Sequence, residues 1–188
     1  MLHRFLLVIL PNAPLAAEVD RMKVLLHSRI GAFSGRATIP HITLFYADLP
    51  AECERDICDG IAKGVIGQRG FTLHYNGITH FPDKRTIYID PVEKDAIAVV
   101  RAPIIAAVKA SDTLRDAIRE TDHPHLTIAA GLKPAQFDVA REILTPHVLH
   151  PDFSGELRSE VQVRAVVLLR RALRAGERYE HVRTFALG

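Results

Sequence analysis

The chain has 188 residues, 48% of them apolar and 24% charged, so it can bury a real core, and a disordered or fibrous protein is excluded. This length suits one domain, or two closely packed lobes, and excludes a multidomain assembly. With 24 Lys and Arg against 22 Asp and Glu, the net charge of +2 excludes the broad basic surface of a protein that binds duplex DNA and fits one local anion pocket.

The first part of the chain predicts alternating strands and helices. The apolar run Phe5–Leu10 predicts a buried strand, since a membrane span needs about 20 apolar residues and a signal peptide needs a longer apolar centre. Helical periodicity follows over Pro14–Ser28, and the β-branched and aromatic segment Ile39–Ala47 predicts a second strand. A second helix is expected where apolar residues recur at four-residue spacing, at Ile57, Ile61 and Val65.

The rest of the chain repeats this alternation. Two β-type segments, Phe71–Phe81 and Arg85–Asp90, flank a Pro-Asp-Lys turn and predict a hairpin. An Ala-rich helix reaches about Ala110, kinked or restarted at its internal proline, and Thr113–Thr121 is a short helix or an ordered loop. The last elements are a strand at His125–Ala129, a helix from Pro134 to about His147, and a C-terminal hairpin of Glu160–Arg170 and His181–Leu187. This order predicts an α+β fold with antiparallel sheets.

The two cysteines indicate the redox compartment. Cys53 and Cys58 lie in the second predicted helix and form neither a C-x-x-C pair nor a disulfide framework. A reducing environment fits this usage best, so we expect a cytoplasmic protein that does not bind a membrane.

One pentapeptide occurs twice in the chain. Pro40–Leu44 (PHITL) and Pro124–Ile128 (PHLTI) share three residues, and the other two positions exchange Ile and Leu. The copies lie nearly half the chain length apart and in matching strand contexts. An internal duplication is the simplest account.

Strand alternation gives each copy a polar face. His41 and Thr43 point one way, as do His125 and Thr127, while the apolar residues between them face the core. If a pseudo-twofold axis relates two lobes, all four polar groups converge on one ligand. Two imidazoles that titrate near neutrality can take a proton from a nucleophile and give one to a leaving group. The hydroxyls can donate hydrogen bonds to phosphoryl oxygens.

Two plainer interpretations compete with this one. A single His-x-Thr is more often a core histidine with a satisfied hydrogen bond, but two copies in equivalent places reverse that preference. A zinc site needs three or four ligands, and neither His41 nor His125 has cysteine or carboxylate companions at metal-ligand spacing. The predicted chemistry therefore uses no metal and no cofactor.

The paired His-x-Thr-hydrophobic motifs, with this separation and chain length, resemble the 2H phosphoesterase superfamily, which includes the 2′-5′ RNA ligase-like proteins and the RNA 2′,3′-cyclic phosphodiesterases. The resemblance implies one bilobal domain over residues 1–188, with the motifs at 41–43 and 125–127. It implies two pseudo-twofold-related lobes, each an antiparallel sheet with flanking helices, around a central cleft. The catalytic residues that it implies are His41, Thr43, His125 and Thr127.

The resemblance also implies a reaction. Family members hydrolyse 2′,3′-cyclic phosphodiesters of nucleotides or RNA ends without a metal, and some join RNA ends reversibly through a 2′-5′ bond. A nucleotide cyclic phosphate or an RNA terminus is therefore the expected partner. In the ligase-like branch a basic residue commonly follows the second motif, whereas here the segment 129–131 reads Ala-Ala-Gly, which counts against a ligase-type grip on the substrate.

Three further residues are candidates for substrate contact. Tyr46 follows the first motif and is placed to stack on a base, but strict alternation sends it to the buried face unless the strand bends or bulges. Its neighbour Phe45 is expected to pack in the core. Lys84 and Arg85 lie at the predicted hairpin turn, where a cation can reach a phosphate.

Two functions from other classes remain open. A non-catalytic protein that binds nucleotides or RNA ends would use the same cleft, although both intact motifs favour an enzyme. A scaffold that binds a peptide in the groove would show no dependence on phosphate.

Overall fold

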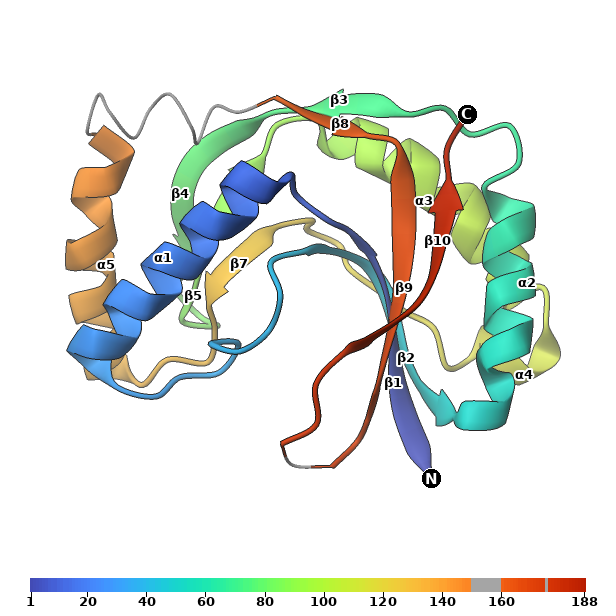
Figure 1. Ribbon diagram of the computed structural model, residues 1–188, viewed down its shortest axis with the longest axis horizontal. Helices are drawn as coiled ribbons and strands as arrows, with labels where there is room; N and C mark the ends of the chain where they lie inside the picture. The colour runs from blue at the N-terminus through green and yellow to red at the C-terminus, as the bar shows by residue number, and fades with distance from the viewer. Residues whose placement is uncertain (150–159, 175) are drawn as a thin grey trace.

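The structure, a computed structural model, describes residues 1–149, 160–174 and 176–188. Its fold is mixed α+β, as predicted, with an eight-stranded sheet and a separate two-stranded sheet (Figure 1). The large sheet consists of β1 (Leu2–Ile9), β2 (Ile42–Pro50), β4 (Tyr75–Phe81), β5 (Thr86–Pro91), β6 (Arg119–Glu120), β7 (Leu126–Ala129), β9 (Ala165–Ala172) and β10 (Glu180–Ala186). Their order is β10-β9-β1-β2-β7-β5-β4, with β6 beside β2. The small sheet pairs β3 (Phe71–Leu73) with β8 (Val161–Val163).

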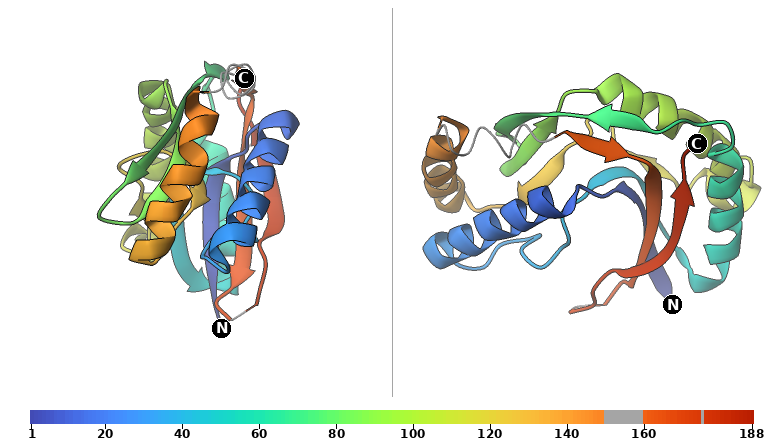
Figure 2. Two further views of the ribbon diagram at one scale, coloured as in Figure 1. Left: turned by 90° about the vertical axis from the view of Figure 1, so that its left-hand side faces the viewer. Right: turned by 45° about the horizontal axis from the view of Figure 1, so that its top comes forward.

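Helices flank the large sheet at both ends of an arch. They are α1 (Ala13–Ile30), the short 3-10 helix η1 (Ala51–Cys53), α2 (Glu54–Gly64), α3 (Lys94–Lys109), α4 (Asp112–Arg115) and α5 (Pro134–Leu149). α1 and α5 lie at one end of the arch, and α2 and α4 at the other (Figure 1, Figure 2). No helix of the described residues is long and apolar enough to cross a membrane.

The large sheet consists of two half-sheets that share the same order of three strands. We call β10-β9-β1-β2 the first half-sheet and β7-β5-β4 the second half-sheet. The motif strands β2 and β7 are antiparallel neighbours that meet at the pair Ile42–Leu126. β1 pairs with β2 as β5 pairs with β7, and β9 pairs with β1 as β4 pairs with β5. The predicted antiparallel sheets are thus joined edge to edge in one sheet.

The helices cross between the half-sheets. α1 follows β1 of the first half-sheet but contacts β7 and α5 beside the second. α3 follows β5 of the second half-sheet but contacts β2 of the first and packs along α2. Each half-sheet is therefore covered in part by a helix that continues from a strand of the other.

Two glycines let α2 and α3 approach closely. Gly60 and Gly64 lie one turn apart on α2, and a Cβ added at Gly60 would lie only 2.9 Å from the Cα of Val108 in α3. A Cβ at Gly64 would collide with the backbone of Ile104. Any larger residue at these positions forces the two helices apart, because close-packed interiors have little spare volume.

The predicted elements are all present, and a few boundaries differ. α3 runs through its internal proline as one helix, and the Thr113–Thr121 segment holds both α4 and β6. The predicted strands Phe71–Phe81 and Glu160–Arg170 each divide in two, at His74 and at Arg164, because the chain leaves the small sheet there and enters the large one. β-type residues continue through both bends, so composition does not mark them.

Candidate active site

Both motifs show the predicted alternation. The apolar residues of the two motifs are fully buried, whereas their histidines and threonines are half-buried; the buried set is Ile42, Leu44, Leu126 and Ile128. Phe45 is buried too, as expected. The polar side chains therefore occupy the open face of the central strands β2 and β7.

The two motif histidines are held in the same way. Nδ1 of His41 lies 2.7 Å from the carbonyl oxygen of Ile39, and Nδ1 of His125 lies 2.7 Å from that of His123. A carbonyl oxygen can only accept, so Nδ1–H donates in both rings and the neutral imidazole keeps the lone pair of Nε2 free. Each histidine thus offers Nε2 as the atom that can take up or deliver a proton.

A β-bulge follows each threonine. Leu44 is the extra residue in β2, because the residues on either side of it pair with consecutive residues of β1. Ile128 is the extra residue in β7, where consecutive residues of β5 pair with the residues that flank it. A bulge shifts the strand by one residue and reverses the alternation beyond it.

The first bulge brings Tyr46 onto the open face. Beyond Leu44 the face that carries Thr43 continues with Tyr46, which is half-buried and lines the cleft. The guanidinium of Arg4 lies 4.9 Å from the centre of its ring and also forms a two-point ion pair with Asp48. The strand irregularity that a base contact by Tyr46 requires is therefore present.

One cleft of about 770 Å³ joins these groups. Its lining includes His41, Thr43, His125 and Tyr46, together with the segment that precedes β2 and the β9–β10 connection. Thr127, two residues after His125 on β7, is half-buried and lies outside this lining.

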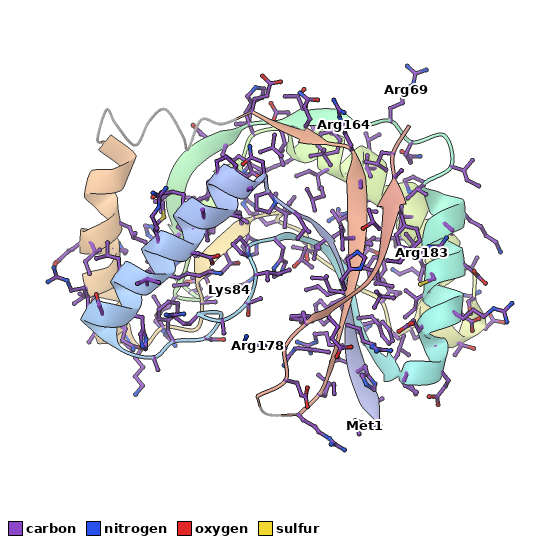
Figure 3. All side chains as sticks on the ribbon, in the orientation of Figure 1. Met1, Arg69, Lys84, Arg164, Arg178 and Arg183 are labelled. Carbon is purple, nitrogen blue, oxygen red and sulfur yellow. The ribbon has the colours of Figure 1, made fainter. Side chains whose placement is uncertain are left out.

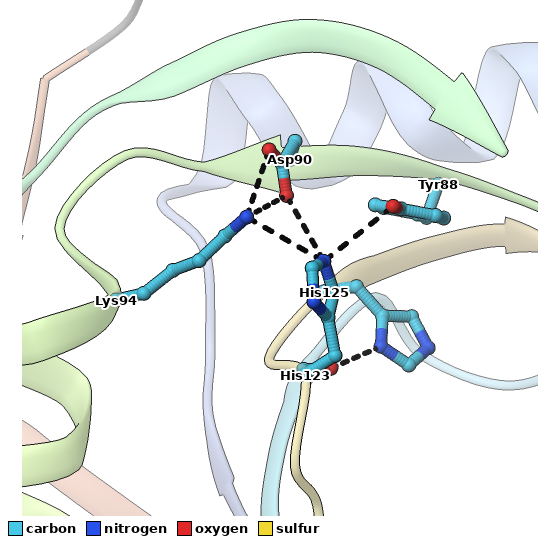
Figure 4. Close-up of polar contacts among 5 residues, drawn as sticks. All are labelled: Tyr88, Asp90, Lys94, His123 and His125. Atoms are coloured by element: carbon cyan, nitrogen blue, oxygen red, sulfur yellow. Dashed lines mark hydrogen bonds and ion pairs between the residues drawn. The ribbon is translucent and has the colours of Figure 1, made fainter. Parts of the chain in front are cut away.

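His125 lies against an aromatic and charged wall. The ring centres of Phe81 and Tyr88 lie 5.3 and 5.2 Å from that of His125, both edge-on. Behind it, Nε2 of His123 lies 3.6 Å from a carboxylate oxygen of Asp90, which forms an ion pair with Lys94 (Figure 4). The residue whose carbonyl holds His125 is therefore itself anchored.

Burial lowers the pKa of both motif imidazoles below the ordinary value of 6.5. The charges of Lys23 and His125 lower the pKa of His41 further. Around His125, the charges of His123 and Lys84 also lower its pKa, whereas the Asp90 carboxylate raises it. Both rings are thus biased toward the neutral form, and only His125 has a carboxylate that opposes this bias.

The two predicted turn cations have different surroundings. Lys84 is exposed, with Nζ 5.5 Å from the centre of the Phe81 ring, and so lies close enough to act on His125 (Figure 3). Arg85 instead donates from Nε to the carbonyl oxygen of Leu132 at 2.6 Å, and its own carbonyl accepts the N–H of that residue. Its contacts therefore hold the β4–β5 turn to the loop before α5.

A match of the sequence to a protein-family model agrees with the geometry of the two motifs. A family model described as the 2′-5′ RNA ligase superfamily matches residues 11–175. The chain belongs to this superfamily, the 2H phosphoesterases. Its members are phosphoesterases and RNA ligases, so the protein belongs to a superfamily of enzymes. No curated protein sequence matches the chain.

Solved 2H phosphoesterase folds are similar over nearly the whole chain. Escherichia coli LigT complexed with 3′-AMP gives a TM-score of 0.62 at 16% identity, covering 100% of this chain and 99% of that one. TT0787 of Thermus thermophilus gives 0.65 at 14% identity, covering 98% and 97%. A structure described as a phosphoesterase gives 0.56 at 16% identity, covering 100% and 99%. At this identity the likeness establishes the fold.

The cleft of this 2H phosphoesterase includes residues to which the sequence assigned no role. Arg4 from β1, Arg171 from β9, and Arg178 and Tyr179 from the β9–β10 connection form its far wall. The guanidinium of Arg171 lies 5.2 Å from the centre of the Tyr179 ring. Arg4 reaches the motifs through the pairing of β1 with β2, and the other three through the pairing of β9 with β1, which no sequence pattern specifies.

Acidic, histidine and cysteine side chains do not gather in groups of three or more that could hold a metal ion, among the described residues. Cys53 and Cys58 are both buried and free, and burial raises the pKa of both thiols. The polar side chains that line the cleft are imidazoles, hydroxyls, arginines and one carboxylate, that of Glu177.

Proposed function

We propose that the protein hydrolyses 2′,3′-cyclic phosphodiesters of nucleotides or RNA ends by acid–base catalysis between His41 and His125. The observation that carries the proposal is the matched anchoring of the two rings. Each is fixed through Nδ1 to a backbone carbonyl, and each keeps Nε2 free beside one cleft. Proton donors and acceptors need such positioning to act on one reacting group.

In the proposed reaction, the cyclic phosphate lies between the two Nε2 atoms. One neutral imidazole takes a proton from water as the water oxygen bonds to phosphorus. The other, protonated imidazole gives its proton to the ribose oxygen whose bond to phosphorus breaks. Thr43 and Thr127 donate hydrogen bonds to the non-bridging oxygens, which gain charge in the transition state.

The corresponding anchoring makes either histidine competent for either role, and the orientation of the ribose selects between them. If the 5′-hydroxyl of a second RNA end replaces water and the 3′-oxygen leaves, the product is a 2′-5′ linkage. Ligation is therefore the same displacement with another nucleophile.

The bound molecules in related structures support a nucleotide substrate. LigT has been solved with 3′-AMP, with ATP and with NADP+. In this chain the cleft offers an aromatic ring at Tyr46 and cations at Arg171 and Arg178, groups that suit bases and phosphates. Lys84 lies outside the cleft lining, but its charge acts on His125.

The direct test is turnover in EDTA of nucleoside 2′,3′-cyclic phosphates and of an RNA oligomer that ends in one. We expect His41→Ala and His125→Ala each to lower kcat by at least about 1000-fold, within the range for removal of a general acid or base. The matched control is His27→Ala, because Nδ1 of His27 also lies on a backbone carbonyl, that of Gly31, but outside the cleft. Nucleotide binding without turnover by the wild type would contradict the proposal and indicate a binding protein.

A further inference from the structure

A second, smaller hollow adjoins the cleft. It has a volume of about 290 Å³ and lies between α1, the segment that precedes β2 and the β9–β10 connection. The two hollows share four lining residues, which are Ala37, Thr38, Ile39 and Arg178. Arg178, which is labelled in Figure 3, lines both hollows. Because the carbonyl of Ile39 anchors His41, the second hollow begins at the backbone that holds a motif histidine.

The second hollow contains a buried cation with few partners. Lys23 on α1 is 2% exposed and lines the hollow. Its Nζ donates to the carbonyl oxygen of Thr38 at 2.5 Å and forms a longer ion pair with the carboxylate of Asp20 at 3.8 Å. An ammonium has three N–H groups, so donor capacity is left over. A buried charge is costly unless it is paired and hydrogen-bonded.

Further positive charge faces the same space. Arg36 lines the hollow, lies near enough for its charge to lower the pKa of Lys23, and has a buried Nε without a hydrogen-bond partner among the described residues. Arg178 adds a third cation, against the single carboxylate of Asp20. Like charges held together around an open space favour an anion in that space.

We propose that this second hollow binds a second phosphate group of the substrate while the reacting phosphate lies between His41 and His125. The inference rests on the proposed function for the place of the first phosphate. Lys23 and Arg36 would supply charge-assisted hydrogen bonds to the second, with Arg178 between the two. The protein would then prefer nucleotides that carry two phosphates over nucleoside 2′,3′-cyclic monophosphates. The second phosphate is either a terminal monoester or an internucleotide diester.

The test compares kcat/KM for three substrates. They are a nucleoside 2′,3′-cyclic phosphate, the same compound with a 5′-phosphate, and a dinucleotide that ends in the cyclic phosphate. We expect a second phosphate to raise kcat/KM at least about tenfold, as charge-assisted contacts do. An advantage confined to the 5′-phosphorylated compound identifies the terminal monoester, and one confined to the dinucleotide identifies the diester.

Arg36→Ala is the informative variant. We expect it to remove most of the advantage of the second phosphate, and we expect Arg36→Lys to keep part of it. The matched control is Arg29→Ala, which removes the same charge from an exposed position in the last turn of α1, outside the lining of the hollow. Lys23→Met is less decisive, because Lys23 also holds the carbonyl of Thr38.

Equal kcat/KM for all three substrates would overturn the inference and leave the proposed function standing. So would an equal loss of the advantage in Arg36→Ala and Arg29→Ala. If no substrate is turned over, the proposed function fails and equilibrium binding decides the inference alone. A nucleoside 3′,5′-bisphosphate would then bind at least about tenfold more tightly than the 3′-monophosphate, and Arg36→Ala would abolish the difference. Equal binding of the two ligands would overturn the inference.

Discussion

The His41 and His125 motifs share a backbone and differ in their surroundings. Both rings are held through Nδ1 by the carbonyl two residues earlier, and both threonines precede a β-bulge. Phe81, Tyr88 and a group of charged residues that includes Asp90 lie around His125. At His41, the largest effect of a charged side chain on the pKa comes from Lys23. The symmetric part of the site suits proton transfer, and the asymmetric part suits recognition of one substrate orientation.

The two motifs also differ at the position two residues after the bulge residue. Tyr46 follows the first bulge and lines the cleft, whereas the equivalent position after the second bulge is Ala130, which forms an isolated bridge with Ser34. We propose that the halves arose by duplication and that the positions beyond the bulges diverged to give the cleft one side for a base.

The largest effects we expect after the histidine variants come from the two threonines. Thr43→Val and Thr127→Val should each lower kcat about 100-fold, the loss typical of removing one donor to a developing oxyanion. Thr184→Val on the exposed edge strand β10 is the control. Thr127 is the sharper case, because it lies outside the cleft lining. Full activity of Thr127→Val would show that the two motifs do not act alike.

A smaller loss is expected at Tyr46. Tyr46→Ala should raise KM between about fivefold and 100-fold, since stacking of a base on an aromatic ring contributes about 1–3 kcal/mol. Tyr46→Phe keeps the ring and should bind substrate nearly as well as the wild type. Unchanged KM in Tyr46→Ala would show that the asymmetry beyond the bulges does not serve base recognition.

The pH dependence of kcat/KM tests the protonation of the pair. The proposed reaction needs one charged and one neutral imidazole, and kcat/KM reports the free protein. Both pKa values are lowered from 6.5, so the half-protonated pair becomes scarcer above that pH. We expect kcat/KM to be greatest below pH 6.5 and to fall by up to about tenfold per pH unit above it. A rise between pH 7 and pH 9 would contradict this.

The smallest effect is expected at His123. Its backbone carbonyl, which holds His125, survives in His123→Ala, so kcat/KM near the optimum should change by less than about threefold. The charge of His123 lowers the pKa of His125, so its removal should move the alkaline limb of the profile to higher pH. His74→Ala removes a ring that pairs with Glu93 elsewhere and should leave the profile in place.

Much of the site could be predicted because it depends on local rules. The repeat and the two-residue period of a strand place the four motif side chains on one face, and the structure has this alternation in both motifs, with the histidines and Thr43 in the cleft lining. The order of elements gives the α+β class for the same reason. These features depend on neighbours in sequence, which a single chain displays.

The rest depends on pairing between distant strands. The bulge at Leu44 is a property of the register of β2 against β1, and without it Tyr46 would face the core. Arg171 and Arg178 reach the cleft only because β9 pairs with β1. Arg85, predicted as a phosphate contact, donates from Nε to the carbonyl of Leu132, 47 residues away, a partner that no local pattern indicates. Register and long-range contacts leave no mark in local composition.

The crossed helices have a thermodynamic consequence. α1 covers part of the second half-sheet, and α3 covers part of the first. Neither repeat can therefore bury its apolar face alone. An ancestral duplication would ordinarily give two units that melt separately. Here we expect one cooperative transition, with the calorimetric enthalpy of unfolding equal to the van't Hoff value, because loss of either half uncovers the other. Gly64 lies at the helix contact that enforces this coupling, so Gly64→Val should destabilise the whole molecule.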